Sequence, residues 1–238
     1  MEVRLARLIG LSVFLLALLL CPGVRARAQQ GDAPYPNMAP LDQYLMADRD
    51  TEIALARTAA PRAISDNAEI MVLDRDGYKP AVKGTNGFVC MVERAFSGGL
   101  DFAEFWNPKN RSPICFNPAA ARSYLPITLA KTKLAIAGKS KPQIFDVIEA
   151  ALDRKELPAI EPGAVCYMMS KEGYLNDHIG HWHPHLMFFV PLTEAKAWGA
   201  NLPDSPIFAD VEVPNRLTVF MVPVSKWSDG TVDSASKN

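Results

Sequence analysis

The stretch of sequence that decides the fold is residues 70–95, IMVLDRDGYKPAVKGTNGFVCMVERA. It contains three extended segments, at 70–73, 78–83 and 88–95, separated by two turn signals. Asp74-Arg75-Asp76-Gly77 marks the first turn and a glycine-bounded tetrapeptide marks the second. In the third segment, alternate side chains would face opposite sides of a sheet. The stretch therefore predicts three consecutive antiparallel strands.

The segments on either side of this stretch have different patterns. Before it, apolar residues at helical spacing predict a helix over 41–60, which Pro61 ends. After it, residues 97–113 are rich in Gly, Asn, Pro and aromatic residues without any period, which is typical of a loop over the surface. Residues 113–116 predict one short strand.

Two helical stretches follow this short strand. The first opens at the cap and first-turn pair Asn117-Pro118, is expected to kink at Pro126, and ends at Gly138. The second begins with Ser140 and Gln143, which form a capping-box pattern ahead of an apolar stripe. We therefore expect a helical pair in the middle of the chain.

The last third of the chain contains three nearly continuous apolar runs, at 164–169, 185–190 and 217–224. Runs of this length and composition are typical of buried strands. Strands, then a helical pair, then strands again indicate an α+β domain. We expect a single domain with a mixed or antiparallel sheet and two or three packed helices.

The N-terminus has the three parts of an export signal. Arg4 and Arg7 give a positive start, residues 8–21 are uncharged and largely apolar, and Ala26-Arg27-Ala28 places small residues where a signal peptidase reads them. The apolar run is shorter than the about 20 residues that a membrane-spanning helix needs. We therefore predict a signal peptide at 1–28 and no stable membrane span after its cleavage.

The predicted cleavage defines the remaining organisation. Residues 29–40 are rich in proline and polar residues and predict a flexible arm. The globular α+β domain is expected over 41–224, and the polar, serine-rich residues 225–238 predict a disordered tail. The protein is expected to be exported and to be periplasmic or secreted.

The overall charge excludes one class of partner. The chain has 25 lysine and arginine residues against 26 aspartate and glutamate residues. Proteins that bind nucleic acid through its phosphates need a basic excess. We therefore expect no nucleic-acid partner, and a small molecule or another envelope protein fits the composition better.

All four histidines of the chain, His178, His181, His183 and His185, fall within eight residues. Neutral imidazole is the commonest transition-metal ligand, and H-x-H on an extended strand places two imidazoles on one face. His181 and His183 are therefore the best chelating pair for zinc or another transition metal. His178 or Asp177 would supply a third ligand.

Two features of the histidine cluster leave a purely structural interpretation open. Three alternating residues on a straight strand are too far apart to share one ion, so His185 would reach it only through a bend at Pro184. Metal sites also usually recruit a ligand from a distant segment, and the chain has no distant histidine. In the structural interpretation, His185 begins a buried strand and the cluster is a polar loop.

Three cysteines remain after cleavage, Cys90, Cys115 and Cys166. An oxidising compartment permits one disulfide and leaves one thiol. Pairing Cys90 with Cys115 would attach the loop between them to the sheet, and Cys166 would then be a buried thiol. A Cys/His nucleophile, formed by Cys90 or Cys166 with His185, is the alternative, without a local signature to support it.

Two segments resemble a group of exported bacterial proteins that has no assigned activity. They are GTNGFVC at 84–90 with Val-Glu-Arg at 92–94, and Gly-His-Trp at 180–182 leading into PHLMFF at 184–189. The resemblance extends over about residues 54–224. It implies a shared framework rather than an activity, and that framework would include Asn86, Cys90, Glu93, Arg94, His181 and His185.

Two functions are consistent with these patterns. The first is an exported envelope protein that acts as a non-enzymatic binding or structural domain. The alternative is a metal-dependent enzyme, similar to a hydrolase, that uses the cluster from His178 to His185. In the alternative, the metal would activate water and Glu93 or Asp177 would act as the base.

Overall fold

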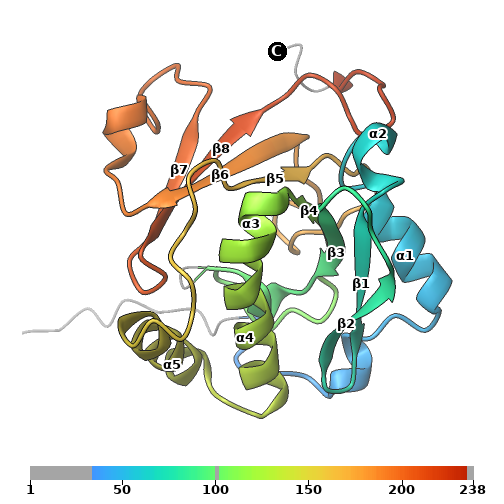
Figure 1. The fold of residues 1–238 in the computed structure, drawn as a ribbon, viewed down its shortest axis with the longest axis vertical. Coiled ribbons are helices and arrows are strands. Elements are labelled where there is room, and N and C mark those ends of the chain that lie inside the picture. Colours follow the sequence, from blue (N-terminus) through green and yellow to red (C-terminus); the bar gives the residue numbers. More distant parts are fainter. Residues whose placement is uncertain (1–33, 100–101, 235–238) are drawn as a thin grey trace, which may run out of the picture. The chain divides into compact units, whose positions relative to one another are not determined.

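The computed structural model describes residues 34–99 and 102–234. This part of the chain forms one α+β domain with five α-helices and a mixed sheet of eight strands (Figure 1). The predicted fold class is therefore confirmed. The predicted signal peptide, 1–28, and the first residues of the predicted arm, 29–33, lie outside the described residues.

The sheet runs through the whole described domain. Its strands are β1 (Glu69–Asp74), β2 (Gly77–Val82), β3 (Val89–Glu93), β4 (Ser112–Phe116), β5 (Val165–Met168), β6 (His185–Pro191), β7 (Phe208–Glu212) and β8 (Leu217–Pro223). Their order is β2-β1-β3-β4-β5-β6-β8-β7. The pairing of β1 with β3 is parallel, and the other neighbouring pairs are antiparallel.

The helices are short and lie mainly in the first two thirds of the chain. The α-helices are α1 (Arg49–Arg57), α2 (Arg62–Ser65), α3 (Pro118–Ser123), α4 (Leu125–Ile136) and α5 (Lys141–Asp153). Three 3-10 helices accompany them: η1 (Leu41–Gln43), η2 (Ala95–Ser97) and η3 (Ala195–Trp198). No helix among the described residues is long and apolar enough to cross a membrane.

The first three strands are where predicted, but their pairing differs from three consecutive antiparallel strands. β1 and β2 form the predicted hairpin, whereas β3 pairs with the far side of β1 in parallel. The connection from β2 crosses the start of β1, where the Thr85 N–H donates to the Asn67 carbonyl at 2.8 Å. A Cβ on Gly84 would lie 2.1 Å from the Glu69 nitrogen, so this crossing needs glycine.

The predicted helix boundaries are confirmed where capping residues marked them. The Asn117 side chain accepts a hydrogen bond from the Ala120 N–H and caps α3. Gly138 follows the end of α4 with a φ of +76°, as is common just after a helix. Ser140 and Gln143 form the predicted capping box of α5. The helix predicted over 41–60 is shorter, because Asp48 caps α1 and the helix begins at Arg49.

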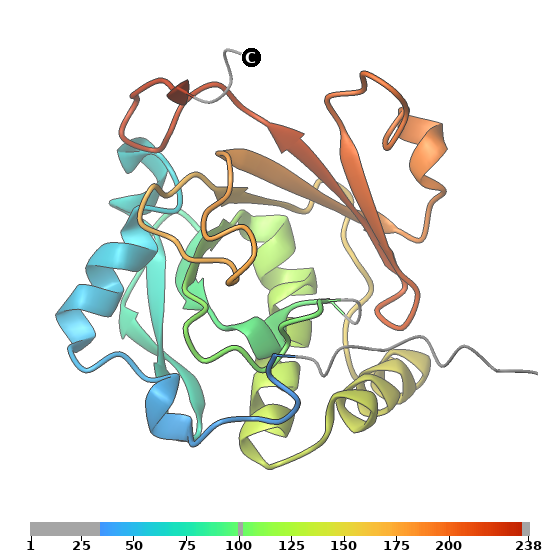
Figure 2. The ribbon, with the colours of Figure 1, turned by 180° about the vertical axis from the view of Figure 1, so that it is seen from behind.

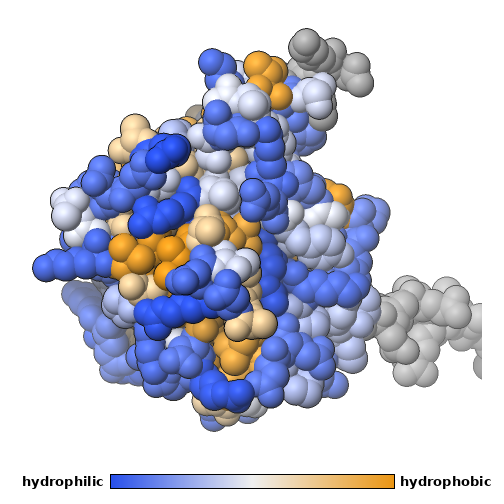
Figure 3. Space-filling model, turned by 90° about the vertical axis from the view of Figure 1, so that its right-hand side faces the viewer, coloured by the Kyte–Doolittle hydropathy of each residue, from blue (hydrophilic) through white to orange (hydrophobic). Residues whose placement is uncertain are grey.

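The two faces of the sheet carry separate cores. On one face, α3 and α4 contact β2, β4 and β5, and Met91, Ile114 and Phe116 are fully buried there (Figure 1). On the other face, α1 contacts β1, β3 and β4 over a smaller cluster that includes Cys90 and Val92. The surface on the side of α1 is mainly hydrophilic, with apolar side chains visible between the charged ones (Figure 3).

Three segments predicted as loose or superficial lie against the domain instead. In the loop over 97–113, Phe105 and Trp106 are buried, because the loop contributes its aromatic rings to the core. Tyr35, in the predicted flexible arm, packs against that core. In the predicted disordered tail, Trp227 is buried and stacks on His181, so this part of the tail lies against the domain.

Candidate functional site

A cavity of about 540 Å³ lies under the strands β6, β8 and β7. One wall of the cavity is formed by alternate side chains along these three strands, because every second residue of a strand points to the same face of the sheet. These residues are His185, Met187 and Phe189 on β6, Val219, Met221 and Pro223 on β8, and Phe208, Asp210 and Glu212 on β7. Most of this wall is therefore apolar, and its two carboxyl groups belong to β7.

Two loops supply the opposite wall of the cavity. Gly98, Gly99 and Phe102 come from the connection between β3 and β4, and Leu175 and Trp182 come from the connection between β5 and β6. The two loops lie side by side when the molecule is seen from behind (Figure 2), and they are joined through the backbones of residues 111 and 174. The cavity is thus built between one half of the sheet and two long loops.

One of the residues that line the cavity is an ionisable group in an unusual environment. Glu93, the last residue of β3, lines the cavity, and its carboxyl accepts from the Thr128 hydroxyl at 3.3 Å. Burial raises the pKa of Glu93 to about 7, although the charge of Lys131 opposes this rise. Glu93 therefore changes its charge close to neutral pH.

Lys131 lies behind Glu93 on α4 and is fully buried. Its ammonium donates to the Gly98 carbonyl at 3.1 Å and lies 5.1 Å from the ring centre of Phe145. Burial lowers the pKa of Lys131, and the charges of Glu212 and Glu93 oppose that change. Lys131 is not among the residues that line the cavity, but its charge interacts with the carboxyl groups of Glu93 and Glu212, which do.

Glu212, the last residue of β7, also lines the cavity. One carboxylate oxygen accepts from the Asn215 side-chain amide. The other lies close to the loop backbone, since a Cβ on Gly99 would be 3.1 Å from it. A side chain at position 99 would therefore press against Glu212, and glycine keeps the carboxylate accessible to the cavity.

The four histidines have different environments. The Nδ1 of His181 contacts the Gly173 carbonyl at 2.9 Å, and the Nδ1 of His183 contacts the Asp233 carboxylate at 2.7 Å. His185 donates from Nδ1 to the His183 carbonyl at 2.7 Å, and burial lowers its pKa. His178 is exposed on the loop.

This arrangement gives no geometric support to the predicted metal site. Within residues 34–99 and 102–234, no group of three or more His, Cys, Asp or Glu side chains is placed to hold a metal ion. His181 and His183 each use Nδ1 for a contact within the protein. Zinc binding by His181, His183, His178 and His185 therefore stays a prediction from the sequence.

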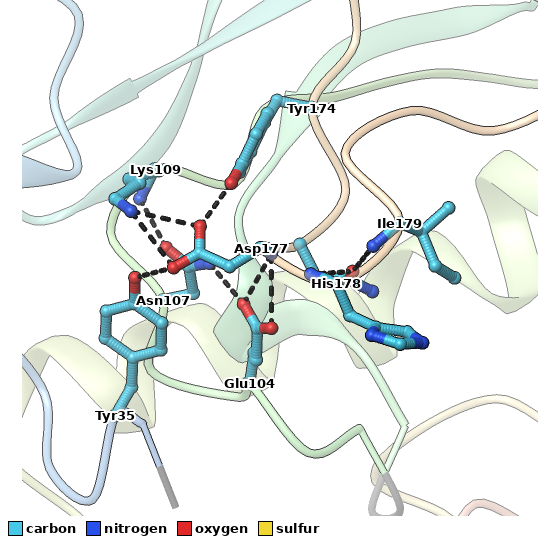
Figure 4. Close-up of polar contacts among 9 residues, drawn as sticks. Tyr35, Glu104, Asn107, Lys109, Tyr174, Asp177, His178 and Ile179 are labelled. Carbon is cyan, nitrogen blue, oxygen red and sulfur yellow. Dashed lines mark hydrogen bonds and ion pairs between the residues drawn. The ribbon is translucent and has the colours of Figure 1, made fainter.

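Asp177, the other base considered for a metal-dependent enzyme, is the centre of a structural network (Figure 4). Tyr35 and Tyr174 donate their hydroxyls to its carboxylate, and the Lys109 ammonium lies 3.0 Å from both oxygens. The backbone N–H of Asp177 donates to Glu104. These donors hold the pKa of Asp177 far below its ordinary value, so its carboxylate is a weak base.

The cysteines fit the predicted pairing. Cys90 and Cys115 face each other on β3 and β4, and their Sγ atoms are 2.00 Å apart. Cys166 is a free, buried thiol. Burial raises its pKa well above the ordinary value, which disfavours the thiolate that a Cys/His nucleophile needs.

Sequence reasoning named Glu93 and His185 but missed the cavity that contains them. Lys131 and Glu212 were also missed. Two signals point to them: a lysine at a buried position of the apolar helix LPITLAKTKLAI, and the alternation of acidic and apolar residues in FADVE at 208–212. A search of family models, curated proteins and solved structures found no match to this chain.

Proposed function

We propose that this is an exported protein that binds a small, largely apolar molecule in the cavity under β6, β8 and β7. The observation that carries the proposal is the cavity itself, about 540 Å³ in volume, which lies within the size range of ligand pockets. An apolar lining with a few convergent polar groups is the usual composition of such pockets. The polar groups here include the carboxyl groups of Glu93 and Glu212.

The side chains of the wall suit a ligand of adaptable shape. Met168, Met187 and Met221 all line the cavity. Methionine is unbranched and polarisable, so it adjusts to irregular apolar surfaces. The ring of Trp182 is held in place by a bond of 3.2 Å from its indole nitrogen to the Met168 carbonyl. The wall therefore combines an indole ring held in place by its hydrogen bond with three adaptable methionine side chains.

Export rests on the sequence of residues 1–28. The Cys90–Cys115 disulfide supports it, because disulfides persist in oxidising compartments. A periplasmic or secreted carrier, or a sensor domain of the envelope, is the kind of protein that this combination fits. The alternative of a metal-dependent hydrolase has no supporting contact among the described residues.

The proposal is tested with N-phenyl-1-naphthylamine, a neutral probe that becomes fluorescent in apolar surroundings. We expect saturable binding with one site per chain. Met187→Trp, which puts a large ring into the cavity, should abolish this binding. Val211→Trp is the matched control, since Val211 lies on β7, is 41% exposed and does not line the cavity. Equal binding by all three proteins would contradict the proposal.

A further inference from the structure

The ionisable groups of the cavity are unevenly distributed. Glu93 and Glu212 come from β3 and β7, which lie far apart in the strand order, yet both line the cavity, and their charges act on each other and on Lys131. Asp210 lines the cavity from the same face of β7 as Glu212. Two ammonium groups donate to backbone carbonyls of the loop that lines the cavity, Lys131 to Gly98 at 3.1 Å and Lys141 to Phe102 at 3.0 Å, and neither lysine lines the cavity itself. With both glutamates ionised, the lining of the cavity has a net negative charge.

The other basic side chains at the cavity do not neutralise this charge. Arg94 points to the opposite face of the sheet and is paired with Glu52 at 2.8 Å. His183 is paired with Asp233 at 2.7 Å. Burial lowers the pKa of His185, which favours its neutral form. The carboxyl groups therefore dominate the electrostatics of the cavity lining.

We propose that the ligand of this cavity is an amphipathic organic cation, with its amine between Glu93 and Glu212 and its apolar body against the methionine and aromatic wall. This inference rests on the proposed function. An ammonium group offers three donors to the carboxylate oxygens, and hydrogen bonds between charged groups are among the strongest in proteins. The reduced dielectric of the interior strengthens the attraction further.

Ligands with other head groups fit this cavity less well. A carboxylate or phosphate head would face two glutamates, and neither ammonium group lines the cavity. An inorganic cation would leave the apolar part of the cavity without contacts. An alcohol would fill the same volume but would gain no charge-assisted bonds. The charge of the head group is therefore the property that the cavity distinguishes.

Proton release is expected to accompany binding of the amine. The ammonium group binds the ionised form of Glu93, whose pKa in the free protein is raised to about 7 by burial. The affinity should therefore rise with pH as Glu93 loses its proton, and level off above pH 8. The titratable groups whose charges interact with Glu93 are Lys131 on α4, Glu212 on β7, Tyr124 before α4, Cys166 on β5 and Tyr78 on β2.

The experiment measures displacement of N-phenyl-1-naphthylamine at pH 8 by decylamine, decanol and decanoate, which share an apolar body. The expected order of affinity is amine, then alcohol, then carboxylate, with at least about tenfold between the first two. The double variant Glu93→Gln/Glu212→Gln should reduce the amine to the affinity of the alcohol and leave decanol unchanged. Glu149→Gln, on the exposed side of α5, is the matched control and should behave as wild type.

The outcomes separate this inference from the proposed function. If decanol displaces the probe and decanoate binds as tightly as decylamine or more tightly, the amine assignment is overturned and the cavity remains a binding site. An amine preference that survives in the double variant would also overturn it. No binding of the probe or of any decyl compound to the wild type would contradict the proposed function itself. The comparison of head groups on the wild type does not depend on the folding of any variant.

Discussion

On one face of the sheet, the half formed by β1, β3 and β4 is packed differently from the half formed by β6, β8 and β7. Under β1, β3 and β4, residues such as Met91 and Ile114 are fully buried against the helices. Under β6, β8 and β7, Met187 and Met221 are only partly buried, because they face the cavity. The far face of this second half is covered differently, by Trp198 of η3, which stacks on Phe220 at 4.3 Å.

Under the proposed function, one sheet provides both stability and a binding site. The first half forms the cores on both of its faces, and the disulfide and the buried Glu52–Arg94 pair reinforce it. The second half adds Phe189, Leu217 and Val219 to the core on the same face, and this face also borders the cavity. A change in the first half should therefore affect folding, and a change in the second should affect binding.

The largest effect on stability is expected from Arg94→Met. Arg94 is 1% exposed and donates to Glu52 at 2.8 Å and to the Tyr44 carbonyl at 2.7 Å. Removing it leaves the buried Glu52 carboxylate without its partner, which costs about 3–5 kcal/mol of unfolding free energy. Urea unfolding measures this loss. Arg216→Met removes an exposed ion pair in the second half and should cost less than about 1 kcal/mol.

A pair of core truncations compares the same face in the two halves. Ile114→Ala removes a fully buried side chain under the helices and should cost about 2–5 kcal/mol. Met187→Ala enlarges an existing cavity, where fewer contacts are lost, and should cost about 1 kcal/mol. Thermal and urea unfolding give both values. Equal costs would show that the second half is as tightly packed as the first.

Removal of the disulfide should also separate stability from binding. Cys90→Ala/Cys115→Ala removes the link between β3 and β4 and is expected to cost about 2–4 kcal/mol. The affinity for N-phenyl-1-naphthylamine should stay the same, because neither cysteine lines the cavity. A large loss of affinity in the folded variant would mean that the two halves are coupled.

A change in stability of the opposite sign is expected from Glu93→Gln. Burial raises the pKa of Glu93 to about 7 in the folded protein, above its ordinary value of 4.5. The folded state therefore holds a proton that the unfolded state releases, so this group reduces stability as pH rises from 4.5 to 7. Glutamine does not titrate, and the variant should gain up to about 3 kcal/mol relative to wild type by pH 8. An unfolding series from pH 4 to 8 measures the difference.

The sequence predicted the elements of the first half better than their arrangement. Ser140 and Gln143 marked a helix start because capping is a local interaction. The parallel pairing of β1 with β3 was not predictable, because it depends on the approach of Gly84 to a backbone 15 residues earlier. The apolar runs at β6 and β8 identified two strands, but the edge strand β7, with its alternating carboxyl groups, was missed.

The candidate site was less predictable than the fold for a physical reason. A cavity is a property of side chains brought together by long-range pairing, and no spacing within the sequence reports it. The four histidines drew attention because they are neighbours in sequence, yet His181 and His183 have separate partners. Glu93 was recognised as a base, whereas the lysine behind it, Lys131, is hidden in an apolar helix.

The most direct test of a binding half and a stabilising half uses methionine methyl groups as reporters. NMR spectra of the protein labelled with ¹³C at its methionine methyls are recorded with and without N-phenyl-1-naphthylamine. We predict probe contacts and shifts at Met168, Met187 and Met221, which line the cavity, and none at Met71 and Met91 under the helices. Contacts at Met71 or Met91, or none at the three cavity methionines of the probe-bound protein, would contradict the account.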